Sequence, residues 1–458
     1  MITSLLKLEK NFFWTMIHIL IGFLCTINQN IIIFWFYLFL FSNLNKIFSI
    51  FLLSSSFRYF IPFFVYIASF DVLGRMLKSS PFIPWELSKY FIIATSLILI
   101  VSKKIKVNIN SGFFLLLLLI PGFLVRESDL VNISDIRSYL FGPISMALLV
   151  IVLSGYKINK SFFDATLRMI WLTSIVTLVY VFIKTPDYSD LTFSLSADFE
   201  TTGGFGSNQV STILGVGMFL SFYAWMNKLC FSGYHSFDGA FIGLFAYQGF
   251  LTFSRGGMVV SILSIFVYYV LFRTPKSFSE IKKNKSLNPF YYFIIALTIL
   301  ISSFGIIQII SSGNIALRYL GETSATLSGA KIKTINTITT GRLNIFLADL
   351  DLWYENFIFG VGAGGSKFLR GNNLDGIAPH IEFSRMLAEH GLFGLTFMLV
   401  LMVLGIKIYR VNSSDINRAI LISIFFIGIA STMHSSLRTF VTPIFIGLST
   451  VSILKDES

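Results

Sequence analysis

The residues best suited to chemistry lie between Thr340 and Gly391, beside apolar sequence long enough to span a membrane. This tract holds Arg342 after a Thr-Gly pair, a glycine-rich turn at 360–365, and His380 directly after a proline. A guanidinium at a helix start can clamp a phosphate, because the backbone donors and the macrodipole there also attract anions. The same dipole disfavours an imidazolium, so a neutral His380 could act as a base. A solvated arginine and a hydrogen-bonded structural histidine are the alternatives.

The other polar residues of the tract carry weaker signals. Asp349 and Asp351 form a D-x-D pair, which can hold a divalent cation. Two positions apart on a helix, however, side chains point about 200° away from each other. We therefore expect solvated or capping carboxylates and no metal. Glu389 lies about two and a half helical turns after His380 and is expected to support the site. The glycines predict a tight turn against a ligand or another helix, since no buried strand precedes them as in a nucleotide fold.

A second arginine stands between two apolar segments with almost no loop around it. Arg255 follows Ser254 and precedes two glycines. An arginine at the bilayer centre costs about 2.5 to 3.5 kcal/mol, and less near the interface. A guanidinium kept in such a place indicates a binding partner, although an interfacial arginine that reaches the lipid headgroups is the simpler alternative.

The composition indicates a polytopic membrane protein. The 458 residues are 55% hydrophobic and only 13% charged, whereas soluble domains are about a quarter charged. Apolar windows must be helical in hydrocarbon, where no water satisfies the backbone. We predict an all-α fold with 12 to 14 transmembrane helices: an N-terminal bundle (1–311), a long loop with short helices (312–387) and C-terminal helices (388–458). The windows are 12–27, 30–44, 47–73, 87–101, 112–125, 138–154, 163–183, 207–226, 237–253, 256–272, 290–311, 388–406, 419–433 and 440–454.

Basic residues concentrate in alternate connections, which predicts the orientation. One side carries the runs at 103–106 and 282–285, whereas the short connections on the other side carry Arg75, Lys78, Arg126, Arg137, Lys184, Arg255 and Arg438. Both termini are therefore expected in the cytoplasm and the long loop on the outer side. The net charge of +12 is explained by loops against anionic membrane lipids and requires no nucleic acid.

Five separated elements resemble motifs of the superfamily of O-antigen ligases and O-antigen polymerases. The residues 252–256 fit its T-x-S-R-G element, and 341–342 and 360–362 fit its G-R and G-x-G elements. The pattern H-x-x-[YF]-x-x-x-L-x-E-x-G fits His380, Phe383, Leu387, Glu389 and Gly391. An upstream polar element is similar to 206–209. The chain has Ile381 where the family often has asparagine, so that contact is absent or comes from Asn372 or Asn373.

The resemblance implies an inverting, metal-independent glycan transfer that needs no cofactor. The donor would be a glycan linked to undecaprenyl diphosphate, and the acceptor a sugar hydroxyl at the periplasmic face of the bacterial inner membrane. In this interpretation Arg255 and Arg342 stabilise the diphosphate and His380 is the base. The residues expected to bind substrate are Asn208, Gln209, Ser254, Gly362, Glu382 and Glu389.

Within this family the acceptor distinguishes two functions. A polymerase of O-antigen, capsule or exopolysaccharide transfers the glycan to a growing lipid-linked chain, whereas a ligase transfers it to the lipid A core. We expect a polymerase. A flippase for the same lipid-linked glycan is a third interpretation. A transporter would place charged or broken helices near the midplane, whereas the polar groups here are predicted on one face.

Overall fold

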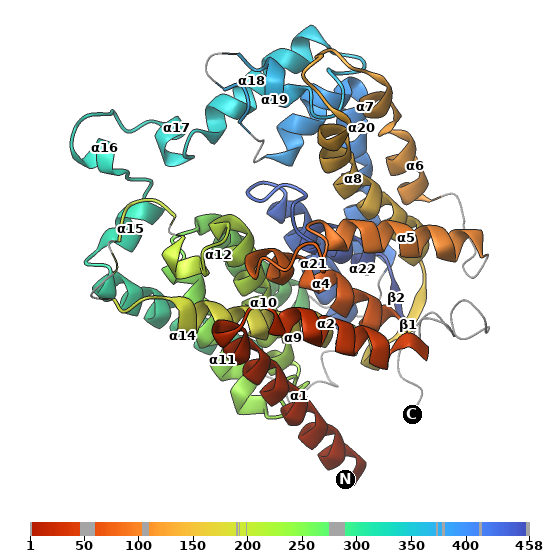
Figure 1. The fold of residues 1–458 in the computed structure, drawn as a ribbon. Coiled ribbons are helices and arrows are strands. Elements are labelled where there is room, and N and C mark those ends of the chain that lie inside the picture. Colours follow the sequence, from red (N-terminus) through yellow and green to blue (C-terminus); the bar gives the residue numbers. More distant parts are fainter. Residues whose placement is uncertain are drawn as a thin grey trace.

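The computed structural model describes residues 2–45, 60–102, 110–188, 191, 193–197, 199–273, 289–371, 374–377, 381–411 and 415–454. Helices dominate this part of the chain, which confirms the predicted all-α membrane fold (Figure 1). The first part contains α1 (Ile2–Ile27), α2 (Ile31–Ser42), α4 (Ile61–Met76), α5 (Leu87–Val101), α6 (Ser111–Leu117), α7 (Ile120–Leu124), α8 (Ile133–Leu153), α9 (Lys160–Lys184), η2 (Glu200–Thr202), α10 (Ser207–Met226), α11 (His235–Leu251), α12 (Arg255–Arg273) and α14 (Pro289–Ile310).

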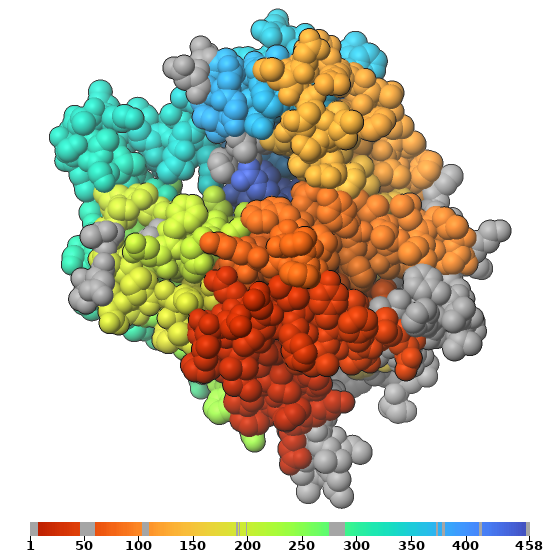
Figure 2. All heavy atoms as spheres, viewed as in Figure 1, coloured from red at the N-terminus to blue at the C-terminus, as the bar shows by residue number. Residues whose placement is uncertain are grey.

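Short helices follow in the segment predicted as a long loop. They are α15 (Asn314–Tyr319), α16 (Ser324–Leu327), α17 (Ile335–Ile338), α18 (Arg342–Glu355) and α19 (Ser366–Leu369). The chain then continues through α20 (Glu382–Val411), α21 (Asp415–Ser431) and α22 (Val441–Ser449). Figure 2 shows a hollow between the arm formed by α15–α17 and the cap formed by α7, α8 and the start of α20; the segment that joins α21 to α22 is visible at its floor.

Each predicted apolar window overlaps a helix. Among the described residues, seven helices are long and apolar enough to cross a membrane, and several others are shorter. The seven spans are Leu8–Ile27, Ile133–Leu153, Lys160–Lys184, Ser207–Met226, Arg255–Arg273, Pro289–Ile310 and Glu382–Val411. The window 112–125 is divided into α6 and α7, because Pro121 at the second position of α7 cannot donate a backbone hydrogen bond. The total of 12 to 14 spans stays a prediction.

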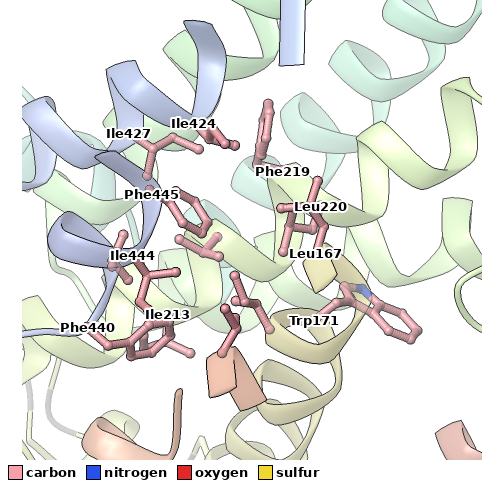
Figure 3. Close-up of a cluster of buried hydrophobic side chains, with 14 of the residues drawn as sticks. Leu167, Trp171, Ile213, Phe219, Leu220, Ile424, Ile427, Phe440, Ile444 and Phe445 are labelled. Carbon is pink, nitrogen blue, oxygen red and sulfur yellow. The ribbon is translucent and has the colours of Figure 1, made fainter. Parts of the chain in front are cut away.

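The apolar core joins helices from both ends of the chain. In Figure 3, Phe219 of α10 lies near Ile424 of α21, and Leu167 of α9 lies on the side of the cluster that faces Phe445 of α22. The buried indole of Trp171 donates a hydrogen bond to the Ser221 hydroxyl (2.8 Å). The C-terminal helices therefore complete the same bundle that the N-terminal helices begin, and their position fixes the segment that connects α21 to α22.

One predicted helix end is wrong. The window 440–454 was expected to be helical, but α22 ends at Ser449 and Ser452–Leu454 forms strand β2. This strand pairs in parallel with β1 (Lys157–Asn159). The long-range pairing gives the chain end backbone hydrogen bonds that the short apolar pattern could not reveal, for example from Ser452 N to Tyr156 O (2.8 Å).

Four contacts at or near the ends of the apolar spans each join two parts of the chain that are predicted on the same side of the membrane, and they fall into two sets. In the first set, Asn11 donates to the Cys230 carbonyl (3.0 Å), and β1 pairs with β2. In the second set, Arg75 donates to the Arg438 carbonyl (2.7 Å), and Arg255 donates to the Ile338 carbonyl (2.6 Å). This grouping agrees with the predicted alternation of connections between two sides of a membrane. Which side faces the cytoplasm stays a prediction from the charge pattern.

Candidate active site

Arg255 is the first residue of α12 and follows a tight turn from α11. Within that turn Phe253 has φ of 53°, a left-handed conformation that is uncommon for a bulky residue. The Ser254 hydroxyl donates to Asn208 Oδ1 (2.9 Å) and accepts from the Ser211 hydroxyl (2.9 Å). Two of the predicted binding residues, Asn208 and Ser254, thus hold the Arg255 turn against the start of α10.

The Arg255 side chain crosses to the segment that precedes α18. It is half-buried, and its Nη2 donates to the Ile338 carbonyl (2.6 Å). The next residue, Gly256, lies against His434, since a Cβ at Gly256 would come within 2.4 Å of the His434 ring. A side chain larger than hydrogen would therefore separate the Arg255 turn from the segment that joins α21 to α22.

Arg342 is the first residue of α18, as predicted, and Gly341 caps the helix with φ of 81°. The first backbone donors of this helix are already occupied. Leu343 N donates to the Thr339 hydroxyl (3.3 Å), and Asn344 N donates to Asn336 Oδ1 (3.1 Å). Anion binding at this helix start therefore depends on the guanidinium, which corrects the expectation that backbone amides would share the task.

Arg255 and Arg342 lie in a concentrated patch of positive charge together with Arg318. Burial lowers the pKa of Arg318 to about 10, and the charges of Arg255 and Arg342 add to that effect. Burial also lowers the pKa of Arg342, with contributions from Arg255 and Arg438. Within the described part of the chain, none of the three forms an ion pair with a carboxylate. A bound anion would relieve this repulsion.

A cavity of about 410 Å³ holds two of the predicted binding residues, Gln209 and Glu382. Gln209 Oε1 is buried and has no hydrogen-bond partner among the described residues. The other lining residues combine aromatic rings with charged groups: Arg75, Trp85, Glu86, Lys89, Asp135, Ser138, Tyr139, Phe205, Lys367, Arg385, Ser436, Leu437 and Arg438.

Most of the charges at this cavity are paired. Lys89 binds Glu86 (2.6 Å), Lys367 lies 3.5 Å from Asp135, and Arg75 binds Asp71 (2.8 Å). The wall of the cavity therefore differs from the arginine patch. The wall carries both hydrogen-bond donors and acceptors, whereas the patch carries a net positive charge.

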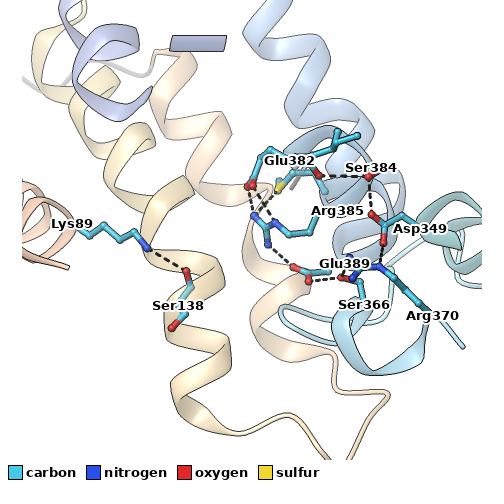
Figure 4. Close-up of polar contacts among 11 residues, drawn as sticks. Lys89, Ser138, Asp349, Ser366, Arg370, Glu382, Ser384, Arg385 and Glu389 are labelled. Atoms are coloured by element: carbon cyan, nitrogen blue, oxygen red, sulfur yellow. Dashed lines mark hydrogen bonds and ion pairs between the residues drawn. The ribbon is translucent and has the colours of Figure 1, made fainter. Parts of the chain in front are cut away.

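Behind the cavity, a chain of buried polar contacts links α18, α19 and α20 (Figure 4). Arg385 pairs with both Glu382 and Glu389 (2.5 Å to Glu389). The Ser366 hydroxyl then donates to Glu389 (2.8 Å). Glu389 is fully buried and occupied by these partners, so in this structure it positions Arg385 and the start of α20.

The D-x-D pair separates into two environments. Asp349 is buried, pairs with Arg370 (2.7 Å) and accepts from the Ser384 hydroxyl (2.6 Å), whereas Asp351 is exposed. The expected divergence of the two side chains is observed, but Asp349 is neither solvated nor a helix cap. Its tertiary partner, Arg370, lies 21 residues away in the chain and could not be read from local spacing.

The glycine-rich turn packs against a kink in α20. Val361 N donates to the Ala388 carbonyl (2.9 Å), and Gly362 N donates to the Glu389 carbonyl (3.1 Å). A Cβ at Gly362 would lie 2.0 Å from the Val125 carbonyl. The opposing kink is at Gly391, with φ of 60° and ψ of −134°. Gly362, predicted to bind substrate, thus permits close approach of two backbones here.

His380 lies outside the described residues, as do Pro379, Asn372 and Asn373. After His380, the described part of the chain continues from Ile381. Helix α20 begins at Glu382, two residues after the histidine, and Glu382 N donates to the Thr432 carbonyl (3.1 Å). The assignment of His380 as the base stays a prediction.

The segment 432–438 also belongs to the site, although no binding or catalytic role was predicted for it from the sequence. Its Thr432 contacts the start of α20, and His434 Nε2 lies 2.8 Å from the Thr212 hydroxyl of α10. Burial and the charge of Arg342 lower the pKa of His434 to about 4, so this ring is neutral. The available signal was the polar run T-M-H-S-S-L-R between two apolar helices.

Comparison with known protein families gives one match at the site. Residues 240–399 match the family described as O-antigen ligase, a range that contains Arg255, Arg342, the glycine-rich turn and Glu389, but not Asn208 and Gln209. No curated protein matches the chain. The match confirms the resemblance found in the motifs: residues 240–399 of this all-α membrane protein are similar to the O-antigen ligase family.

Proposed function

We propose that this protein transfers a glycan from undecaprenyl diphosphate to a sugar hydroxyl, with inversion at the anomeric carbon. The family match supports an enzymatic, glycan-processing role in a membrane. The observation that carries the finer proposal is the patch formed by Arg255, Arg318 and Arg342. Three guanidinium groups from distant segments lie together without a carboxylate ion pair among the described residues, and a diphosphate supplies the missing negative charge.

The chemistry follows from the leaving group. When the bond between the anomeric carbon and the phosphate oxygen breaks, the electron pair stays on the diphosphate. Guanidinium groups that face this oxygen stabilise the developing charge, and their fork geometry suits phosphate oxygens. The acceptor hydroxyl attacks from the opposite face of the sugar and passes its proton to His380. This displacement needs no covalent intermediate on the protein.

The cavity beside the patch suits a sugar. Sugar hydroxyls both donate and accept hydrogen bonds, which matches a wall of paired charges such as Lys89 with Glu86. Trp85 and Tyr139 add ring faces to the same wall. Gln209 adds an amide side chain to the same wall.

We place this site on the periplasmic face of the bacterial inner membrane. The basic runs at 103–106 and 282–285 support cytoplasmic positions for the connections that carry them. Arg75 contacts Arg438 and Arg255 contacts Ile338, and the charges of Arg255 and Arg438 both act on Arg342. These contacts support a common opposite face.

The acceptor we propose is a lipid-linked glycan, which makes the protein a polymerase of O-antigen, capsule or exopolysaccharide. The family description names ligases, so transfer to the lipid A core is the second candidate. A single reconstitution separates these functions. Purified protein is supplied with undecaprenyl-diphosphate glycan and either a second lipid-linked glycan or lipid A core, and the products are analysed by mass spectrometry.

Elongated lipid-linked glycan supports the polymerase, and glycosylated core supports the ligase. Movement of the donor across vesicles without any new glycosidic bond would indicate a transporter and overturn the proposal. Retention of the anomeric configuration in the product would contradict the single-displacement mechanism.

A further inference from the structure

Three arginines, Arg255, Arg342 and Arg438, share one local backbone arrangement. Each follows by two positions a residue other than glycine with a positive φ. These residues are Phe253 (53°) before Arg255, Thr340 (56°) before Arg342, and Ser436 (50°) before Arg438. Such conformations are strained and persist only where the surrounding structure holds them. The repetition identifies Arg438 as a candidate third member of the set.

Arg438 is also held in place from outside its own segment. Its carbonyl accepts a hydrogen bond from Arg75 Nη2 (2.7 Å), and the same guanidinium nitrogen binds Asp71 (2.8 Å). Arg75 thus anchors the Arg438 backbone to α4. This contact uses the carbonyl of Arg438, so a change of the Arg438 side chain leaves the group that Arg75 binds in place.

The position of Arg438 joins the arginine patch to the cavity. Arg438 lines the cavity together with Gln209 and Glu382. Its charge also contributes to the lowered pKa of Arg342, so the two guanidinium groups are near each other. Glu382 shares this wall and its charge acts on Arg438, but its ion pair is with Arg385.

We propose that Arg438 binds the phosphate next to the transferred sugar, while Arg255 and Arg342 hold the phosphate next to the lipid. This inference rests on the proposed function. If the sugar occupies the cavity, the sugar-side phosphate lies where the cavity meets the patch, and Arg438 stands at that junction. The oxygen that leaves the anomeric carbon belongs to this phosphate, so Arg438 stabilises charge that develops as the bond breaks.

The test compares two lipids that differ by one phosphate. Full-length protein in lipid nanodiscs is titrated with undecaprenyl phosphate and with undecaprenyl diphosphate, neither of which carries a sugar. Arg438→Ala should weaken binding of the diphosphate about 10- to 100-fold, as expected for a lost hydrogen bond to a charged group, and should leave the monophosphate nearly unchanged. Arg255→Ala should weaken both. Arg410→Ala removes an exposed arginine of α20 and serves as the control.

Rescue separates binding from a structural role. Added methylguanidinium should restore part of the diphosphate affinity of Arg438→Ala, and Arg438→Lys should retain an intermediate affinity because it keeps the charge without the fork. Equal losses for both lipids, or no loss for either, would overturn the inference. An effect seen only with a donor that carries an acidic sugar would assign Arg438 to the sugar instead. Failure of the wild-type protein to bind either lipid would overturn the proposed function itself.

Discussion

At the scale of single residues, Arg255 and Arg342 are predicted to act through guanidinium geometry as well as charge. Replacement of either by alanine should reduce transfer about 10²- to 10³-fold, the usual effect of removing one group that stabilises a developing anion. Replacement by lysine should also impair transfer, because lysine cannot form the two parallel bonds of a guanidinium. The measurement is product formation by purified protein, normalised to the amount inserted in membranes.

The arginine prediction has a clear contrary outcome. Normal polymer from well-expressed Arg255→Ala and Arg342→Ala proteins would mean that these residues only anchor the protein at the membrane interface. Arg410→Ala, on an exposed position, should transfer glycan at the wild-type rate and controls for the loss of one positive charge.

His380 is predicted to be the general base, and the reaction is predicted to need no divalent metal. Removal of a positioned base typically costs about 10² to 10⁴ in rate, so His380→Ala should nearly abolish transfer. The matched control is His235→Ala, at the start of α11, which should stay active. Turnover is measured with and without excess EDTA. Loss of activity on chelation, restored by a divalent ion, would contradict the mechanism.

At the scale of elements, the buried contact between α18 and Arg370, which directly follows α19, is predicted to stabilise the cap where α18 packs against the start of α20. Asp349→Ala removes one partner of the Asp349–Arg370 pair, whose side chains are both fully buried, and leaves a buried unpaired guanidinium. Loss of one partner from such a pair costs about 3 to 5 kcal/mol. The unfolding midpoint of purified Asp349→Ala should therefore fall markedly.

Asp351→Ala provides the control from the same helix. Asp351 is exposed, so its removal should leave the unfolding midpoint close to that of the wild-type protein. Equal midpoints for the Asp349 and Asp351 variants would show that the buried pair does not stabilise the cap.

At the scale of the whole molecule, both termini are predicted in the cytoplasm and the segment 312–387 in the periplasm. The charge pattern motivates this orientation. Reporter enzymes fused after Lys285 and after Gly329 should therefore report opposite compartments, because one predicted span, 290–311, separates the two points. Activity of the same compartment-specific reporter at both positions would contradict the topology and remove the periplasmic site with it.

The apolar windows predicted the described α-helices outside the segment 312–387, because a chain in hydrocarbon must satisfy its own backbone. Arg342 at a helix start and the tight glycine turn were also predictable, since both depend on neighbours in the sequence. The strand at Ser452–Leu454 was not, because its partner β1 is almost three hundred residues earlier in the printed chain. Even a correct local pattern does not specify such a pairing.

The sequence by itself determined that this is a membrane protein, where its apolar helices lie, and which arginines stand in apolar surroundings and need a binding partner. These features follow from composition, periodicity and local backbone chemistry. Only the tertiary structure decided which groups meet. It placed Asp349 with Arg370, Ser254 with Asn208, and Arg438 beside the arginine patch. The physical reason is that helix packing, a sum of many weak side-chain contacts, sets the distances between these groups. A sequence motif depends only on residues that are close in the chain, so it does not show which distant residues will be in contact.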